Sequence, residues 1–469
     1  MRVAFFQPGL VHKRFNENFS VVDRRFGVFP DVGLATAAAV AREAGAQVRI
    51  WDAYATGAEL GEVRREMSRW RPDLLAAAFH SVPAVREVLA WGSVLRRDLD
   101  VPLLLGGHET VRYGLDVMQT APVDYLLQGA SGRTLPPLLD AIETDSGYER
   151  VPGLMWRGRN AVVDNGAPTA VSEPDDPWPA RDLLPLDRYQ SYLTQRRHYT
   201  VLVTARGCPY SCAFCAMARS GYHPRPVDDV IREMEHCIDD LGIHEFDLFD
   251  PLLLHQRDRV LDLCVEISAR KLDMEWACRS RIDLVDPELL RALADAGCRR
   301  IYYGIESGAP AILQRIHKHI DLDSVGRALR MTSDVGIQPL GFFQVGHPGE
   351  TIESARRTIR FALDLPLDYA QFMRTIAKPG SDLEQLLMDA TGRDPWREYV
   401  RGERSDDRLP TPWHDLAPET VDGLVREAYL RFYARPRIAG GTVTRSRSIW
   451  ELRRYLRVAF EMVTRDAEG

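Results

Sequence analysis

The chain has 469 residues, of which 45% are hydrophobic and 27% are charged, and its formal net charge is −7. This length exceeds one ordinary hydrophobic core, so we expect two or three domains. The acidic balance excludes the overall basic character of most nucleic-acid-binding proteins. The sequence shows neither the segments of a signal peptide nor an apolar run of about 18 residues. We therefore expect a cytoplasmic protein with no membrane span and no nucleic-acid partner.

Residues 1–140 alternate strand-like and helix-like segments. We expect strands near 2–7, 47–51, 74–79, 102–105 and 124–127, and helices near 32–44, 59–69 and 82–98. This alternation is typical of a doubly wound, Rossmann-like α/β domain, which binds its ligands at the carboxyl ends of its strands. Residues 141–195 are rich in Pro, Asp, Gly and Arg and predict a linker.

A second alternating series covers residues 196–384. Its expected strands lie near 199–204, 245–249, 274–278, 300–303, 338–345 and 369–376, with helices near 227–241, 257–270, 287–296, 323–335 and 352–365. Six such units in succession indicate a partial (β/α)6 barrel with an open side. Residues 385–469 predict a mainly helical region, with amphipathic helices near 424–435 and 449–463.

The chain has seven cysteines, an odd number that argues against a disulfide framework. Four are scattered singly and fit small buried hydrophobes. The other three lie in Cys208-Pro-Tyr-Ser-Cys212-Ala-Phe-Cys215, directly after an expected strand. Three thiolates can bind three irons of a [4Fe–4S] cluster and leave the fourth iron open to S-adenosylmethionine (SAM). A structural zinc ion requires four protein ligands, and no fourth Cys or His follows at a suitable spacing.

The stretch Arg206–Cys215 resembles the signature of the radical SAM superfamily. The resemblance implies that a loop at the top of the partial barrel holds the cluster on Cys208, Cys212 and Cys215. It also implies that Phe214, the aromatic residue before the last cysteine, lies against the adenine of SAM.

Four further stretches resemble motifs of this superfamily at successive strand ends: Phe249-Asp-Pro, Cys278-Arg-Ser-Arg, Tyr303-Gly-Ile-Glu-Ser-Gly and Gly346-His-Pro-Gly-Glu-Thr. The resemblance makes these residues candidates for SAM binding: Asp250, Arg281, Glu306, Ser307 and Gly346. Glu306 also fits an internal salt bridge with Arg281. His347 is either an acid or base near the radical or a hydrogen-bonded loop histidine. Other polar residues on expected strand-end loops are candidate substrate contacts, together with His347: Tyr222, His223, His255 and Arg374.

The N-terminal domain resembles the cobalamin-binding branch of the superfamily. Phe79-His-Ser81 and Leu104-Leu-Gly106-Gly107 carry the likeness. In that branch, small residues at the positions of Ser81, Gly106 and Gly107 admit the dimethylbenzimidazole tail of the corrin, and glycines permit such close approach. Residues 128–132 lack the two acids that the branch usually carries there, which leaves open a domain that has lost the corrin.

The resemblance implies a cobalamin-dependent methyltransferase that acts on an unactivated carbon of a small molecule. Its electron donor would be a reductase, a flavodoxin or a ferredoxin. An Arg- and Ala-rich composition favours secondary metabolism, such as antibiotic biosynthesis. Without the corrin, the same radical would serve dehydration, epimerisation or dehydrogenation of a polar metabolite such as an aminoglycoside. A third alternative is a non-catalytic sensor of cobalamin or SAM.

Overall fold

The computed structural model describes residues 1–9, 27–129, 131–167, 176–196, 198–404 and 409–438. These residues form two compact units. The first unit contains the described residues within 1–9, 28–189 and 394–404, and the second contains those at 27 and within 190–393 and 409–438. No helix of the described residues is long and apolar enough to cross a membrane.

The first unit is built on a parallel sheet that two antiparallel strands extend. The strand order is β3-β1-β4-β5-β6-β7-β8. The parallel strands are β1 (Arg2–Gln7), β3 (Gln47–Asp52), β4 (Leu74–Ala78), β5 (Leu103–Gly106) and β6 (Tyr125–Leu127), and the antiparallel ones are β7 (Leu154–Arg157) and β8 (Val162–Asp164). The apolar runs of β1, β4 and β5 are buried, as expected for strands covered on both faces.

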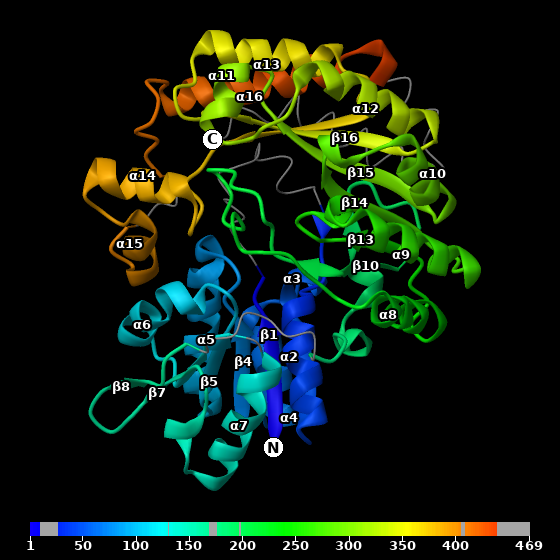
Figure 1. Ribbon diagram of the computed structural model, residues 1–469. Helices are drawn as coiled ribbons and strands as arrows, with labels where there is room; N and C mark the ends of the chain where they lie inside the picture. The colour runs from blue at the N-terminus through cyan, green and yellow to red at the C-terminus, as the bar shows by residue number, and fades with distance from the viewer. Residues whose placement is uncertain (10–26, 130, 168–175, 197, 405–408, 439–469) are drawn as a thin grey trace. The chain divides into compact units, whose positions relative to one another are not determined.

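Helices cover both faces of this sheet (Figure 1). Phe5 of β1 packs in one core cluster with residues of α2 (Val32–Glu43) and α7 (Ser131–Thr144). Phe6 points to the opposite face, because neighbouring residues of a strand alternate, and it lies near α5 (Val85–Leu99). The other helices of this unit's first 130 residues include α4 (Leu60–Trp70) and α6 (Thr110–Thr120). The expected doubly wound domain is confirmed.

The second unit is an open half-barrel. Its six parallel strands follow the order β10-β13-β14-β15-β16-β17, so that β10 and β17 are the two edges. The strands are β10 (Tyr199–Leu202), β13 (Glu245–Leu248), β14 (Glu275–Arg281), β15 (Cys298–Glu306), β16 (Gln338–Val345) and β17 (Tyr369–Arg374). Sequence and structure therefore agree on a partial (β/α)6 barrel.

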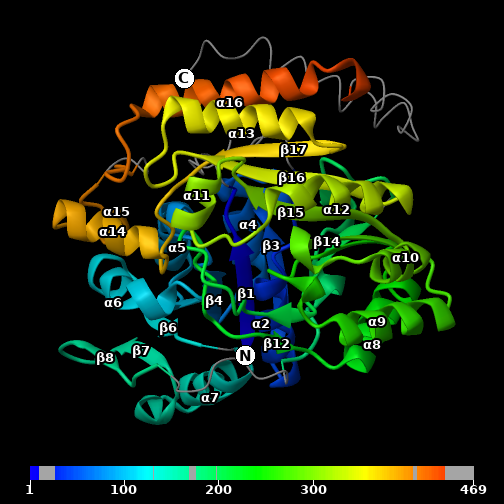
Figure 2. The same cartoon turned by 45° about the horizontal axis from the view of Figure 1, so that its top comes forward.

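Helices lie along the outside of the half-barrel, and Figure 2 shows α13 and α16 running beside β16 and β17. The outer helices are α8 (Val227–Asp239), α9 (Arg257–Ala269), α10 (Pro287–Asp295), α12 (Leu322–Asp334), α13 (Ile352–Asp364) and α16 (Pro418–Tyr433). Two shorter helices are α11 (Pro310–Arg315) and α14 (Asp382–Thr391). Helix α16 corresponds to the helix expected near 424–435, while the one expected near 449–463 lies outside the described residues.

The structure draws two boundaries differently from the sequence patterns. The segment expected as a linker contributes β7 and β8 to the first sheet. Helix α15 (Pro395–Arg401), within the expected C-terminal region, packs on α6 and belongs to the first unit. Burial of Trp396 and Tyr399 accounts for this return of the chain.

Candidate functional site

The three clustered cysteines lie in a loop closed by a short antiparallel ribbon. The ribbon pairs β11 (Ala205–Arg206) with β12 (His223–Pro224). Gly207 follows β11 with a φ of +78°, and a Cβ atom there would lie 2.7 Å from the carbonyl oxygen of Gly221. The loop therefore requires glycine at its entrance, because other residues rarely adopt this conformation and none would fit.

Backbone hydrogen bonds hold the cysteine loop in place. The Cys208 amide donates to Ser220 Oγ at 3.0 Å, and the Cys215 amide donates to the Cys212 carbonyl at 3.0 Å. The Ala213 amide donates to the carbonyl of Ile316, which follows α11, also at 3.0 Å. The loop is thus tied both to itself and to the segment after β15.

The three thiols share one environment. Cys212 is buried, while Cys208 and Cys215 are half-buried. Burial raises the pKa of the Cys208 and Cys212 thiols, and the charges of Lys318 and Arg281 oppose this rise at both. Cations beside the thiols favour the thiolate form that binds metal.

The donor set fits an iron–sulfur cluster. Within the described residues, no three or more His, Cys, Asp or Glu side chains are grouped as ligands of a single metal ion. A [4Fe–4S] cluster does not require such a group, because each thiolate binds a separate iron. Three fixed cysteines beside two cations therefore suit the cluster and its negative charge.

Arg281, at the end of β14, has one buried nitrogen without a hydrogen-bond partner among the described residues. Its Nε and Nη2 donate to Asp283 at 2.9 and 2.8 Å, and Nη2 also donates to the His319 carbonyl at 2.9 Å. Nη1 is buried, and none of the described residues accepts a hydrogen bond from it. The guanidinium also lies 4.1 Å from the ring centre of Tyr210, inside the cysteine loop. A buried donor of this kind suits an anionic group.

Glu306 ends β15 in a backbone conformation that is rare for a residue with a side chain, with a φ of +69°. Its carboxylate is 3.4 Å from Lys318 Nζ and accepts a hydrogen bond from Gln344 Nε2 at 2.8 Å. The alternative expectation of a Glu306–Arg281 salt bridge is wrong, because Arg281 pairs with Asp283 instead. A strained, buried carboxylate at a strand end is typical of a functional site.

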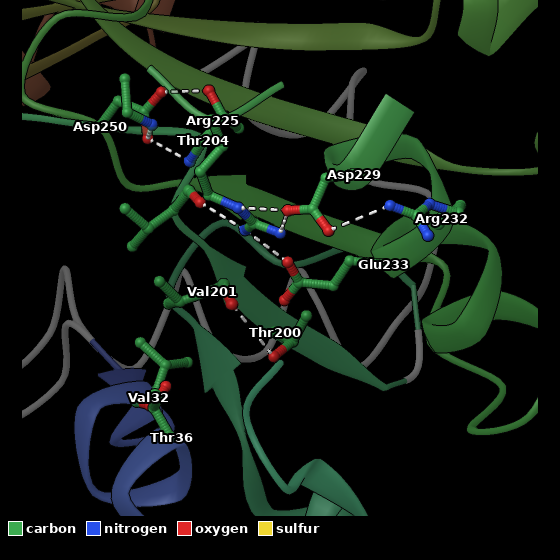
Figure 3. Close-up of polar contacts among 12 residues, drawn as sticks. Val32, Thr36, Thr200, Val201, Thr204, Arg225, Asp229, Arg232, Glu233 and Asp250 are labelled. Carbon is green, nitrogen blue, oxygen red and sulfur yellow. Dashed lines mark hydrogen bonds and ion pairs between the residues drawn. The ribbon is translucent and has the colours of Figure 1, made fainter. Parts of the chain in front are cut away.

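Asp250 binds the segment Thr204–Ala205, which leads into the cysteine loop, and Figure 3 shows its carboxylate beside Thr204. Its carboxylate accepts hydrogen bonds from the Thr204 amide at 2.7 Å, the Thr204 hydroxyl at 2.5 Å and the Ala205 amide at 3.0 Å. Nearby, Arg225 donates to the Val203 carbonyl and pairs with Asp229 and Glu233. These contacts position the strand that leads into the loop.

Phe214 and Ser307 occupy different surroundings. Phe214 packs in an apolar cluster with Leu313 and Trp413, and its ring centre lies 5.6 Å from that of His347. Ser307 is fully buried and exchanges a hydrogen bond of 2.9 Å with Thr358 of α13, so its hydroxyl has a partner within the protein.

Gly346 and His347 follow β16. The Gly346 carbonyl accepts a hydrogen bond of 2.8 Å from Trp413 Nε1. His347 is fully buried, its Nδ1 lies 3.1 Å from Thr375 Oγ1, and its Nε2 has no partner among the described residues. Burial lowers the pKa of His347 to about 3, so the ring is neutral near pH 7.

The structure brings two of the candidate substrate residues together. The ring centres of Tyr222 and His255 are 4.9 Å apart, and His255 lies 6.1 Å from Tyr210 of the cysteine loop. His223 is exposed, with its Nε2 3.3 Å from the Ser220 carbonyl. Arg374 forms an ion pair of 2.8 Å with Asp422 of α16.

The first unit contains a cavity of about 130 Å³ at the carboxyl ends of β1, β4, β5 and β6. Small residues form much of its wall: Gly33, Ala37, Ala76, Ala77, Ala78, Gly106, Gly107 and Gly129. Of the three residues expected to admit a corrin tail, Gly106 and Gly107 line this cavity, whereas Ser81 is not among its lining residues. Gly107 has a φ of +118°, and a Cβ atom there would lie 2.6 Å from the Phe79 carbonyl oxygen.

Two further polar residues lie at these sites. His80 lines the cavity and its Nε2 is 3.1 Å from Asp31, whose charge raises the pKa of His80. Lys318 lies beside the cysteine loop. His80 stands in the Phe79-His-Ser81 motif, whereas the sequence carried little signal for Lys318, because its contact with Glu306 joins two segments.

Residues 202–362 match the family model of the radical SAM superfamily. The chain is 28% identical to an uncharacterized methyltransferase of Pyrococcus horikoshii over 422 residues, covering 87% of this chain and 89% of that protein. It is 26% identical to the anaerobic magnesium-protoporphyrin IX monomethyl ester cyclase of Rubrivivax gelatinosus, covering 72% of this chain and 62% of the cyclase.

A solved structure shares the fold across both units. It is the radical SAM methyltransferase TsrM from Kitasatospora setae, with a TM-score of 0.71 and 16% identity, and the match covers 98% of this chain and 99% of TsrM. Residues 202–362 are therefore a radical SAM domain, and the chain is an enzyme that uses a [4Fe–4S] cluster and SAM.

Proposed function

We propose that this enzyme is a cobalamin-dependent radical SAM methyltransferase that acts on an unactivated carbon of a small-molecule substrate. The observation that carries the proposal is the small-residue cavity of the first unit, in a chain that also contains the cysteine loop. The fold supports it, because TsrM was solved with cobalamin and a [4Fe–4S] cluster bound. The Pyrococcus relative is also described as a methyltransferase.

The cavity suits one part of cobalamin. Its volume of about 130 Å³ is far too small for the whole cofactor, but its narrow, mostly apolar wall suits the flat dimethylbenzimidazole group. A Cβ atom on Gly106 would meet no described atom within 4 Å, so the space at this glycine is open to a ligand. When bound, the corrin supplies a cobalt that carries a methyl group.

In the second unit we propose Cys208, Cys212 and Cys215 as ligands of the cluster. When bound and reduced, the cluster supplies the electron that cleaves SAM to a 5′-deoxyadenosyl radical. The chain's part is to fix the thiols on a hydrogen-bonded loop and to place polar groups around SAM. We propose that Arg281 Nη1, which has no partner among the described residues, binds the carboxylate of SAM, and that Phe214 and the neighbouring neutral His347 contact its adenine.

The proposal is tested by anaerobic reconstitution with hydroxocobalamin, iron and sulfide. We expect corrin absorption bands that persist after gel filtration. Gly106→Leu should fill the open space and reduce retained corrin by at least tenfold, while its iron content stays unchanged. Gly61→Leu, on α4 and outside the cavity, is the matched control and should retain corrin.

A second function is favoured by the relative that is described as a cyclase, since it is not a methyltransferase. In that case the radical would drive another reaction, such as dehydration, epimerisation or dehydrogenation of a polar metabolite. A wild-type protein that forms 5′-deoxyadenosine but retains no corrin would overturn the methyltransferase proposal in favour of this one. A Cys208→Ala/Cys212→Ala/Cys215→Ala variant that still forms 5′-deoxyadenosine would overturn the cluster assignment.

A further inference from the structure

Lys318 is a buried cation with few partners. Only 6% of the residue is exposed, although lysine is almost never buried without a partner. An ammonium group has three hydrogen-bond donors, and the described contact of Nζ is with Glu306 Oε1 at the long distance of 3.4 Å.

The segment that carries Lys318 is fixed to the cysteine loop. Ile316, two residues earlier, accepts the hydrogen bond from the Ala213 amide, and Ile316 packs in the same apolar cluster as Cys212 and Phe214. The backbone amide of Lys318 in turn donates to the Leu313 carbonyl at 2.9 Å. The backbone at Lys318 is therefore fixed beside the cysteine loop.

The absence of a side chain at Gly304 leaves space for the Lys318 ammonium. A Cβ atom on Gly304 would lie 2.9 Å from Lys318 Nζ and 2.4 Å from Glu306 Oε1. Glycine at this position of β15 thus permits the Lys318–Glu306 pair to form. Ala213 directly follows Cys212, so its hydrogen bond to Ile316 brings the residues that precede Lys318 beside that cysteine.

We propose that the buried charge of Lys318 raises the reduction potential of the cluster. This inference rests on the proposed binding of a [4Fe–4S] cluster by the three cysteines. Reduction adds one negative charge to an already anionic group, and a buried cation at short range stabilises the more negative state. Glu306 holds the ammonium in place and partly offsets its charge.

The test is a redox titration of the reconstituted full-length enzyme without SAM, followed by electron paramagnetic resonance. Lys318→Met removes the charge and keeps much of the side-chain volume, and Lys318→Arg keeps the charge. We expect the midpoint potential of Lys318→Met to shift to more negative values and that of Lys318→Arg to stay near the wild-type value. Lys271→Met, which removes an exposed lysine after α9, is the control and should leave the potential unchanged.

A second variant, for which we expect the opposite shift of the midpoint potential, serves in case Lys318→Met does not fold. Glu306→Gln removes the counter-charge and leaves Lys318 in place, so its midpoint potential should shift to more positive values. An unchanged potential in a Lys318→Met protein with full iron content, or a negative shift in Glu306→Gln, would overturn the inference. Because SAM is absent, a contact of Lys318 with SAM alone would leave the potential unmoved. Failure of the wild-type enzyme to bind four irons would instead overturn the proposed function.

Discussion

His347 is buried, and its burial favours the neutral form of the imidazole ring. Burial lowers its pKa from 6.5 to about 3. The unfolded chain therefore takes up a proton at this residue below about pH 6.5, and the folded chain does not until about pH 3. The stability that this residue contributes is fully present above pH 6.5 and is lost as the pH falls from 6.5 towards 3.

We predict that His347→Gln is less sensitive to acid than the wild type. Between pH 7.5 and pH 5.5, the free energy of unfolding of the wild type should fall by about 1.4 kcal/mol more than that of the variant, because one pH unit below 6.5 corresponds to that amount. Urea unfolding at both pH values measures this difference. Equal losses in the two proteins would contradict the prediction, and the exposed His223→Gln serves as the control.

At the scale of single residues, the sequence predicts a role for those that share one short motif. The cysteines and Phe214 are examples, and their contacts with the cluster and the adenine stay predictions. Lys318 escaped notice because its role depends on Glu306 across a turn and on the loop around Cys212. The partner of Arg281 was also mistaken, because spacing along the chain does not reveal which acid a strand-end side chain faces.

At the scale of the elements, one carboxylate holds the segment that leads into the cysteine loop. Asp250 is fully buried and accepts three hydrogen bonds from Thr204 and Ala205. Asp250→Ala would leave two buried amides and a hydroxyl without their acceptor, at about 1–3 kcal/mol each. Thr204→Val would remove the hydroxyl bond and keep both amide bonds.

We therefore predict that Asp250→Ala lowers both the free energy of unfolding and the iron content after reconstitution. Thr204→Val should lower the free energy of unfolding by about 1 kcal/mol and retain most of the iron. Urea unfolding and a chemical iron assay measure the two effects. If Asp250→Ala binds as much iron as Thr204→Val, the loop does not depend on this carboxylate.

Helix α15 is held on α6 by ion pairs between one buried carboxylate and two partly exposed arginines. Asp116 of α6 is 2% exposed and pairs with Arg397 and Arg401, whose side chains are each 38% exposed. Removing both arginines would leave a buried carboxylate without its counter-charges, which costs about 3 kcal/mol or more. Removing the carboxylate leaves two arginines that water can reach.

We expect the double variant Arg397→Ala/Arg401→Ala to be destabilised by about 3 kcal/mol, and Asp116→Asn by about 1 kcal/mol. Urea unfolding of the three proteins gives this order directly. The opposite order would show that the arginines, rather than the aspartate, carry the desolvation cost.

Most helices and strands were predictable because hydrophobic periodicity reports burial along one element. Strands β7 and β8 were not predicted within the expected linker because both are short, and β8, at the edge of the sheet, has no buried residue. The return of α15 to the first unit was not predictable, because nothing in seven residues specifies which of two cores buries Trp396.

At the scale of the whole molecule, the two proposed cofactor sites belong to separate units. All the residues that line the cavity are in the first unit, and the three cysteines with their described contacts are in the second. Each unit also has its own core, so a local change in one should leave the fold of the other intact.

Occupancy of the two sites should therefore be separable in the full chain. We predict that Cys208→Ala/Cys212→Ala/Cys215→Ala retains at least half of the wild-type corrin while binding no cluster, and that Gly106→Leu shows the converse. Corrin absorbance and iron content per chain, measured on the same reconstituted samples, decide this. Loss of both cofactors in each variant would contradict separate sites, because each site would then need the other to be filled. Circular dichroism distinguishes that outcome from unfolding, since an unfolded variant also loses its helical signal.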